Sequence, residues 1–343
     1  SGGNAWTPDG KRVVFSVARG FGAEPAGLLT IDVIPRGRLP KPVAGTGHGR
    51  SPTSSRTGEL AFLRPRTDDN VWRIPLEGGR LGRAVPVAAS PWKDVEPRLS
   101  ADGKRIALCS DRSGSSQVWL CEADGSRAVQ LTRRDAGICS GARISPDGRR
   151  VVFLSDFVGD MEICLATADG EEQVRLTQSP SHETAPSWSR DGSWIYFGSN
   201  REDGFQVWRM RPEPGAPATR VTRAGGYAPV ESEDGRTLYY ARGETAWSVW
   251  KVPVGGGPES LVLPDIANWG AFDVTATALY YVRRHRGKDE LRRLRFADGN
   301  DELLATLEKP YTFGLSAAPG DGSVLVGQRD VDANELLLLG DLE

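Results

Sequence analysis

The residue types that most often perform chemistry are few and scattered in this sequence. Its histidines and cysteines are His48, His182, His285, Cys109, Cys121, Cys139 and Cys164. No two histidines share a position of the repeat described below, so we expect no ring of metal ligands. The cysteine spacing fits neither a zinc pair nor a dense disulfide framework, and we expect buried, inert thiols. The sequence has no Gly-x-Ser-x-Gly motif, and we expect no catalytic residue, no metal and no cofactor.

Charged and polar residues recur instead just before short apolar runs, where they could line one surface. The candidates for ligand binding are Asp94, Glu96, Arg98, Arg143, Glu183, Ser187, Glu231 and Trp269. Arg98 and Arg143 share a repeat position, so two guanidinium groups could converge on a carboxylate-bearing ligand or a peptide terminus. Two structural alternatives stay open. Neighbouring carboxylates could neutralise the arginines, and the acid-x-x-Pro steps could form Asx-type turns.

The elements that would position these residues follow from an internal repeat. Its clearest copy runs from Trp188 to Phe197, with Asp191-Gly192 between two apolar runs, which is typical of a tight hairpin turn. The equivalent glycines are found at positions 10, 58, 103, 148, 192, 235 and 322. Because the aspartate recurs with the turn in most copies, we interpret it as a turn residue and not as a catalytic acid.

The spacing of the turn glycines is 43 to 48 residues, with a last gap of two repeats. This period is that of a propeller blade of four short strands. The sequence therefore predicts an all-β fold, a β-propeller of about eight four-stranded blades, or seven or eight if a terminal blade is incomplete. We expect a single propeller domain over residues 1–343. Whether the repeats close as one ring or form the C-terminal part of a longer array stays open.

Composition limits the classes of partner. The chain is 38% hydrophobic and has a formal net charge of −2. A balance this close to neutral argues against an electrostatic nucleic-acid surface over the whole domain, so we expect no direct nucleic-acid contact. No apolar run reaches about 18 residues, and we expect no membrane insertion by this segment.

The repeat resembles that of the TolB-type, WD-repeat-like propeller family. The residues that carry the likeness are Leu176-Thr177, Glu183-x-x-Pro186, Trp188-Ser189-Arg190-Asp191-Gly192 and Phe197-x-Ser199. A narrower likeness is to the C-terminal propeller region of bacterial winged-helix transcriptional regulators. It rests on Gln206-Val207-Trp208, Val221 to Gly226, Glu231-Ser232, Trp250 to Gly257, Glu308-Lys309-Pro310 and Gly314-Leu315.

These resemblances imply a non-catalytic binding or sensing propeller within a larger regulatory or periplasmic protein. The implied partner is a protein or peptide, or a small anionic ligand. The implied compartment is the periplasm, with the cytoplasm as the alternative. The alternative function is a propeller-type hydrolase or lyase that acts at the central channel.

Overall fold

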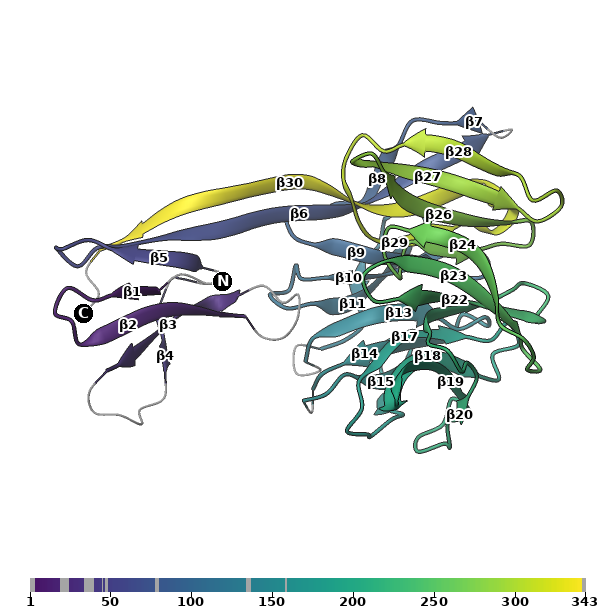
Figure 1. The fold of residues 1–343 in the computed structure, drawn as a ribbon, viewed down its shortest axis with the longest axis horizontal. Coiled ribbons are helices and arrows are strands. Elements are labelled where there is room, and N and C mark those ends of the chain that lie inside the picture. The colour runs from purple at the N-terminus through teal and green to yellow at the C-terminus, as the bar shows by residue number, and fades with distance from the viewer. Residues whose placement is uncertain are drawn as a thin grey trace. The chain divides into compact units, whose positions relative to one another are not determined.

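The computed structural model describes residues 4–18, 25–33, 40–44, 46, 49–77, 80–133, 137–157 and 159–340, so His48 lies outside the described residues. The chain divides into two compact units, residues 1–67 with 331–343 and residues 68–330 (Figure 1). Apart from a short 3-10 turn at Pro319–Asp321, the regular elements of the described residues are β-strands. None of the described helical segments has the length and apolar character needed to cross a membrane.

Five four-stranded antiparallel sheets follow one another along the unit of residues 68–330. The first two contain β9 (Asp94–Leu99), β10 (Arg105–Ser110), β11 (Gln117–Glu122) and β12 (Val129–Gln130), then β13 (Cys139–Ile144), β14 (Arg150–Ser155), β15 (Glu162–Thr167) and β16 (Gln173–Arg175). The third contains β17 (Glu183–Trp188), β18 (Ile195–Glu202), β19 (Gly204–Met210) and β20 (Thr219–Arg220). The last two contain β21 (Tyr227–Glu231), β22 (Thr237–Gly243), β23 (Trp247–Pro253) and β24 (Ser260–Ile266), then β25 (Phe272–Val274), β26 (Ala278–His285), β27 (Lys288–Arg295) and β28 (Asp301–Thr306).

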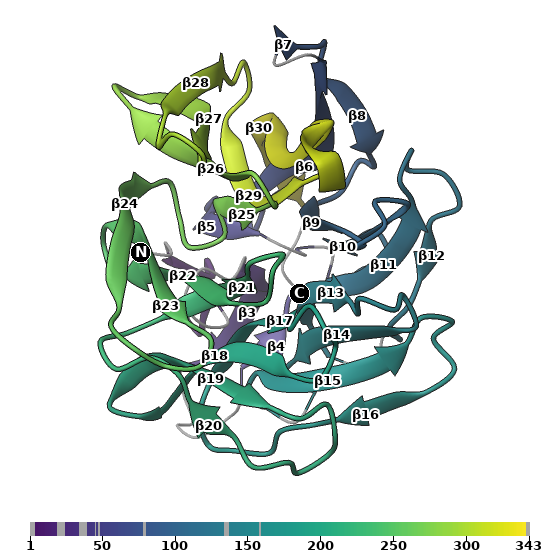
Figure 2. The ribbon, with the colours of Figure 1, turned by 90° about the vertical axis from the view of Figure 1, so that its right-hand side faces the viewer.

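A composite sheet closes this unit. Its strands are β29 (Tyr311–Ala317), β30 (Ser323–Leu339), β6 (Leu60–Glu77) and β8 (Val85–Ala88), and the short β7 (Arg80–Leu81) also pairs with β6. Strand β29 packs against β9 on one side and β25 on the other. The inner strands β9, β13, β17, β21, β25 and β29 therefore form a closed ring around a central axis (Figure 2).

The all-β propeller prediction is confirmed, and the described residues form seven sheets, the lower of the expected numbers. The eighth sheet is missing because the repeats with turns at Gly58 and Gly322 contribute strands to the same composite sheet. We predicted one domain over residues 1–343, whereas the structure divides these residues into two compact units.

The seventh sheet belongs to the unit of residues 1–67 and 331–343. It contains β1 (Asn4–Trp6), β2 (Arg12–Ala18), β3 (Pro25–Asp32) and β4 (Lys41–Pro42), and β5 (Arg50–Ser54) pairs with the first part of β6. Val14 and Leu28 pack with Leu60 and Phe62 in a small core of this unit.

The Asp-Gly turns have the geometry that their sequence predicts. In each of five copies a serine or threonine hydroxyl donates a hydrogen bond to the turn aspartate, and a backbone N–H two residues on donates another. The aspartates are Asp9, Asp102, Asp147, Asp191 and Asp234. These hydrogen bonds, the side-chain one first, lower the pKa of each aspartate below its ordinary value. The structure thus gives these carboxylates a turn role.

The core of the ring lies between neighbouring sheets. One cluster joins Val152 and Ile163 of the second sheet to Trp188, Ile195 and Phe197 of the third, all buried. Burial of each large apolar side chain contributes roughly 1.5 to 3 kcal/mol, so the faces between sheets hold the ring together.

The inner strands carry a bulge that the sequence analysis missed. The backbone adopts a left-handed φ at Glu96, Gly141, Ala185, Ala228 and Gly314, and the pairing with the second strand shifts at each of these positions. A β-bulge bends a strand and turns its side chains. The bulges therefore decide which inner-strand residues face the central axis after the bend.

Candidate functional site

The six inner strands place side chains at equivalent pairing positions, and in five of them this position lies two residues beyond the bulge. These are Arg98, Arg143, Ser187, Val230, Asp273 and Ser316, which pair with Ala107, Val152, Tyr196, Tyr239, Tyr280 and Leu325 of the second strands. Five of the six, all except Arg98, line a cavity of about 120 Å³. We call it the strand-end cavity, because Leu99 and Ala317, at the ends of β9 and β29, also line it.

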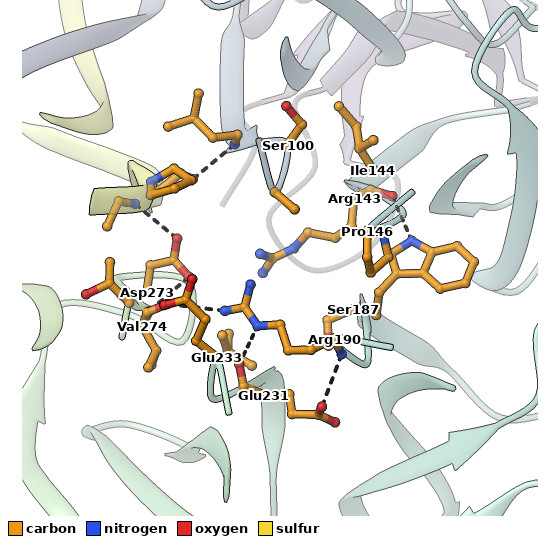
Figure 3. Close-up of a pocket in the computed structure, with 18 of the residues that line it drawn as sticks. Ser100, Arg143, Ile144, Pro146, Ser187, Arg190, Glu231, Glu233, Asp273 and Val274 are labelled. Atoms are coloured by element: carbon orange, nitrogen blue, oxygen red, sulfur yellow. Dashed lines mark hydrogen bonds between the residues drawn. The ribbon is translucent and has the colours of Figure 1, made fainter. Parts of the chain in front are cut away.

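Arg143 is the exceptional charge of the strand-end cavity (Figure 3). Among the described residues its guanidinium is in none of the hydrogen bonds or ion pairs, although the neighbouring Arg98 and Arg190 have partners. Burial and the charge of Arg98 hold the pKa of Arg143 well below its usual range, and Asp273 and Glu96 only partly oppose this. The folded ring therefore holds a cation at an electrostatic cost that an incoming anion would reduce.

Ser187 supplies a second unsatisfied group on the same cavity wall. Its hydroxyl is buried and has no hydrogen-bond partner in the described structure. Buried polar atoms are nearly always paired, so an unpaired one lining a cavity indicates a missing ligand atom or water. Arg143 and Ser187 together offer a charged donor and a neutral donor.

The other two arginines of this region are already engaged. Arg98 forms an ion pair with Asp273 (Nη1–Oδ2 3.7 Å) and donates a hydrogen bond to the carbonyl of Leu315. Arg190 donates to the carbonyls of Glu231 (3.2 Å) and Val274 (3.4 Å). Neutralisation by a neighbouring carboxylate, the alternative left open above, thus applies to Arg98, whereas Arg143 has no ion-pair partner among the described residues.

Two of the three carboxylates that line the cavity have structural partners as well, whereas the third, Glu233, is exposed. Asp273 accepts a hydrogen bond from the Ala317 N–H (3.0 Å), and Glu231 accepts one from the Arg190 N–H (3.1 Å). Each bond joins two different sheets. These acids therefore hold neighbouring sheets in register around Arg143.

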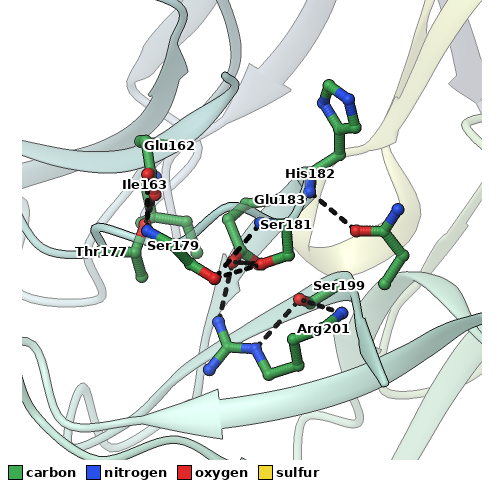
Figure 4. A network of polar contacts seen from close by, with 10 residues as sticks. Glu162, Ile163, Thr177, Ser179, Ser181, His182, Glu183, Ser199 and Arg201 are labelled. Atoms are coloured by element: carbon green, nitrogen blue, oxygen red, sulfur yellow. Dashed lines mark hydrogen bonds and ion pairs between the residues drawn. The ribbon is translucent and has the colours of Figure 1, made fainter. Parts of the chain in front are cut away.

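Besides Arg98, four of the predicted site residues do not line this cavity. Asp94 and Glu183 are buried at the beginnings of β9 and β17 and pair with Arg112 (2.6 Å) and Arg201 (2.8 Å) of their own sheets (Figure 4 shows Glu183). Glu96 lies at a bulge, where its Oε2 accepts a hydrogen bond from the Gly141 N–H. Trp269 packs edge-on against Phe313, with ring centroids 4.5 Å apart.

Three residues of the cavity were missed by sequence reasoning. One copy of the repeat reads Ser-Pro-Asp-Gly, with Pro146 at the second position, whereas another copy has Arg190 at that position. This departure from the repeat could have identified Arg190 as a candidate site residue. Asp273 and Ser316 lie in the least regular repeats, and Ser316 follows a bulge. Because the first of these has lost its Asp-Gly turn, its inner strand could not be aligned from the sequence.

The comparisons with known proteins agree with this geometry. The sequence profile of the TolB beta propeller domain matches residues 134–308, just over half of the chain. The chain belongs to the TolB beta propeller domain family. A putative TolB from Agrobacterium tumefaciens has the same fold, with a TM-score of 0.62 at 19% identity, over 77% of this chain and 99% of that one. TolB from Acinetobacter baumannii gives 0.56 at 13% identity, over 95% and 82%.

A curated relative matches a shorter stretch. Tricorn protease homolog 1 of Streptomyces coelicolor is 38% identical over 75 residues, which is 22% of this chain and 7% of that protein. The likeness therefore covers a small part of that relative's length. These comparisons confirm the TolB part of the predicted resemblance and give no support to the winged-helix regulator part.

The histidines and the other possible metal ligands of this TolB-type ring do not cluster in the described structure. Within the described ranges no group of three or more histidine, cysteine, aspartate or glutamate side chains could hold a metal ion. The imidazole of His182 lies 3.8 Å from Asp160, and both side chains are about half exposed. His285 lies at the exposed end of β26.

The four thiols should be slow to react in the folded protein. Burial raises the pKa of Cys121 and of Cys139 to about 11 and that of Cys164 to about 12, and it raises that of Cys109 well above its ordinary value. Since the thiolate is the nucleophile, we expect modification by Ellman's reagent at pH 8 to be about a hundredfold slower than for free cysteine. Urea should release all four thiols. A thiol that reacts rapidly before urea is added would contradict this expectation.

Proposed function

We propose that the ring of residues 68–330 is a non-catalytic binding or sensing module that holds a carboxylate-bearing ligand, such as a peptide terminus, in the strand-end cavity. The observation that carries this proposal is the unpaired guanidinium of Arg143. Arginine presents a planar fork of donors that matches a carboxylate, and such bonds are strong where water is partly excluded.

The surrounding charges support binding over turnover. Asp273 and Glu231 accept hydrogen bonds that join sheets, so both have a structural role as acceptors. Arg143 and the Ser187 hydroxyl are donors with unused capacity. The third carboxylate of the cavity, Glu233, is exposed to solvent. Two donors in the wall of the cavity suit the recognition of an anion better than hydrolysis or elimination.

The family supports a role in protein interaction and a periplasmic location for the same module. The fold is that of two proteins described as TolB, and this chain covers most of each. A peptide with a free carboxylate is consistent both with the family's role in protein interaction and with the preference of Arg143 for an anion.

The test compares two peptides that differ in one group. Tri-alanine with a free C-terminal carboxylate should bind the wild-type chain in calorimetry, and tri-alanine amide should bind at least tenfold more weakly. Arg143→Met should reduce the affinity for the free acid by about 10- to 100-fold, as expected for a charge-assisted hydrogen bond of about 1.5 to 3 kcal/mol. The melting temperature of this variant should be unchanged or higher, because the substitution removes a cation that the fold disfavours.

Arg127→Met is the matched control, since Arg127 is exposed and outside the cavity. It should leave both the affinity and the melting temperature unchanged. Equal binding of the acid and the amide, or full affinity in Arg143→Met, would refute the proposal. Hydrolysis of a peptide or ester that Arg143→Met abolishes would favour the enzyme alternative.

A further inference from the structure

A second cavity, of about 520 Å³, lies at the other end of the inner strands. Its lining includes Val95 near the start of β9 and Tyr311 at the start of β29, whereas Leu99 and Ala317, at the ends of these strands, line the first cavity. We call it the strand-start cavity. It is therefore a separate site on the opposite face of the ring.

Two hydroxyl groups of this cavity have no partner. Tyr311 is 4% exposed, and neither its hydroxyl nor that of Thr312 forms a hydrogen bond in the described structure. A buried tyrosine hydroxyl normally donates to an acceptor. Burial raises the pKa of Tyr311, so the phenol stays protonated and keeps its donor at neutral pH. Two residues that line the cavity thus carry a hydroxyl without an acceptor.

Asp289 fixes the polar wall beside these hydroxyls. This buried carboxylate accepts hydrogen bonds from Nε (2.8 Å) and Nη2 (3.1 Å) of Arg284 and from the Tyr311 N–H (2.9 Å). Arg284 lines the cavity with a side chain that is 60% exposed. Its Nη1 is in none of the hydrogen bonds of the described residues. The arginine is thereby oriented and retains a free donor.

The cavity opens beside a strongly basic turn. Residues 284–288, which we call the basic hairpin, join β26 to β27, read Arg-His-Arg-Gly-Lys and are all exposed. Arg284 has Asp289 as a partner, but within the described structure Arg286 and Lys288 are in none of the ion pairs. A positive surface therefore borders a cavity lined by two residues with unused hydroxyl donors.

We propose that an acidic peptide segment of a protein partner docks here, with its carboxylates on the basic hairpin and one carbonyl or carboxylate oxygen in the strand-start cavity. Charge complementarity favours an acidic partner, and the hydroxyl donors select an acceptor group. A nucleic acid suits the chain less well, because its formal net charge of −2 argues against an extended basic surface for a chain of phosphates.

The test uses a fluorescein-labelled, C-terminally amidated octapeptide of alternating glutamate and glycine, followed by fluorescence anisotropy at 50 mM salt. The double variant Arg286→Glu, Lys288→Glu should reduce its affinity at least tenfold. The matched control, Lys104→Glu with Arg127→Glu, makes the same change of charge at exposed positions outside the cavity and should retain the affinity. A glutamine-glycine octapeptide should not bind.

Tyr311→Phe tests the contribution of the strand-start cavity to peptide affinity independently of the basic hairpin. It should reduce the affinity about fivefold with an unchanged or higher melting temperature, because the deleted hydroxyl has no partner in the fold. Equal affinity in Tyr311→Phe, an equal loss in the control double variant, or tighter binding of an eight-nucleotide single-stranded DNA would overturn the proposal. Loss of octapeptide binding in Arg143→Met, with binding retained in the hairpin variant, would assign the peptide to the strand-end cavity instead.

Discussion

Replacing Gly314 with alanine should cost about 3 kcal/mol of stability, the sum of backbone strain and a steric clash. Gly314 has a φ of 88°, and a Cβ built there would lie 2.6 Å from Cα of Glu96 and 2.9 Å from Cδ of Pro97. Both neighbours belong to the bulge of β9, the strand on the other side of the ring closure. Backbone atoms cannot rotate away as a side chain can, so β9 or β29 must shift.

Urea denaturation followed by tryptophan fluorescence would measure this loss, because nine of the ten tryptophans lie within residues 68–330. Gly299→Ala is the matched control. Gly299 has a similar φ of 68° but no atom within 4 Å of its Cβ position, so this variant should lose only about 1 kcal/mol of backbone strain. Equal losses in the two variants would show that the contact between bulges does not limit ring closure.

Replacing Arg201 with methionine should cost about 3 kcal/mol at pH 8, because it leaves the buried Glu183 carboxylate without its counter-ion. Methionine retains an apolar chain to pack near Trp208, over which the guanidinium lies (Figure 4 shows the polar contacts). Ser181 would still donate to Glu183 (2.9 Å) but brings no charge.

The loss should depend on pH in a defined direction. Burial raises the pKa of Glu183 above its ordinary value, against the opposing effects of Arg201 and Ser181. A carboxyl whose pKa is raised by folding contributes stability below its unfolded pKa, and that contribution is lost as pH rises through its folded pKa. Without Arg201 the pKa rises further. The difference from wild type should therefore be about 3 kcal/mol at pH 8 and fall to about 1 kcal/mol at pH 4.5.

Arg295→Met is the control for this pH dependence. It breaks an ion pair with Asp298 (2.7 Å) in which both side chains are about half exposed, so it should cost less than about 1 kcal/mol at either pH. A loss in Arg201→Met that is the same at pH 4.5 and pH 8 would mean that packing, and not the charge of Glu183, dominates.

Much of the fold could be predicted because its signals are local. The Asp-Gly turn needs a glycine at positive φ and an aspartate that accepts hydrogen bonds from nearby residues. Each copy of the turn can therefore be recognised from a few consecutive residues. The period of these turns then predicts four-stranded blades. The merging of the repeats at Gly58 and Gly322 into one sheet is a pairing between distant segments, which the local pattern does not encode.

The candidate site shows the same division. The sequence by itself placed Arg98, Arg143, Ser187 and Glu231 near the channel, because inner-strand positions recur with the turns. Only the tertiary structure decided that Asp273 neutralises Arg98 and that Arg143 has no partner in the described part of the chain, since these residues come from three different sheets. Charge balance in a ring depends on which blades are neighbours and on how each bulge turns its strand. The identity of the neighbouring blades and the direction of each strand after its bulge are both set by packing within the ring. The sequence of a single repeat contains no information on either.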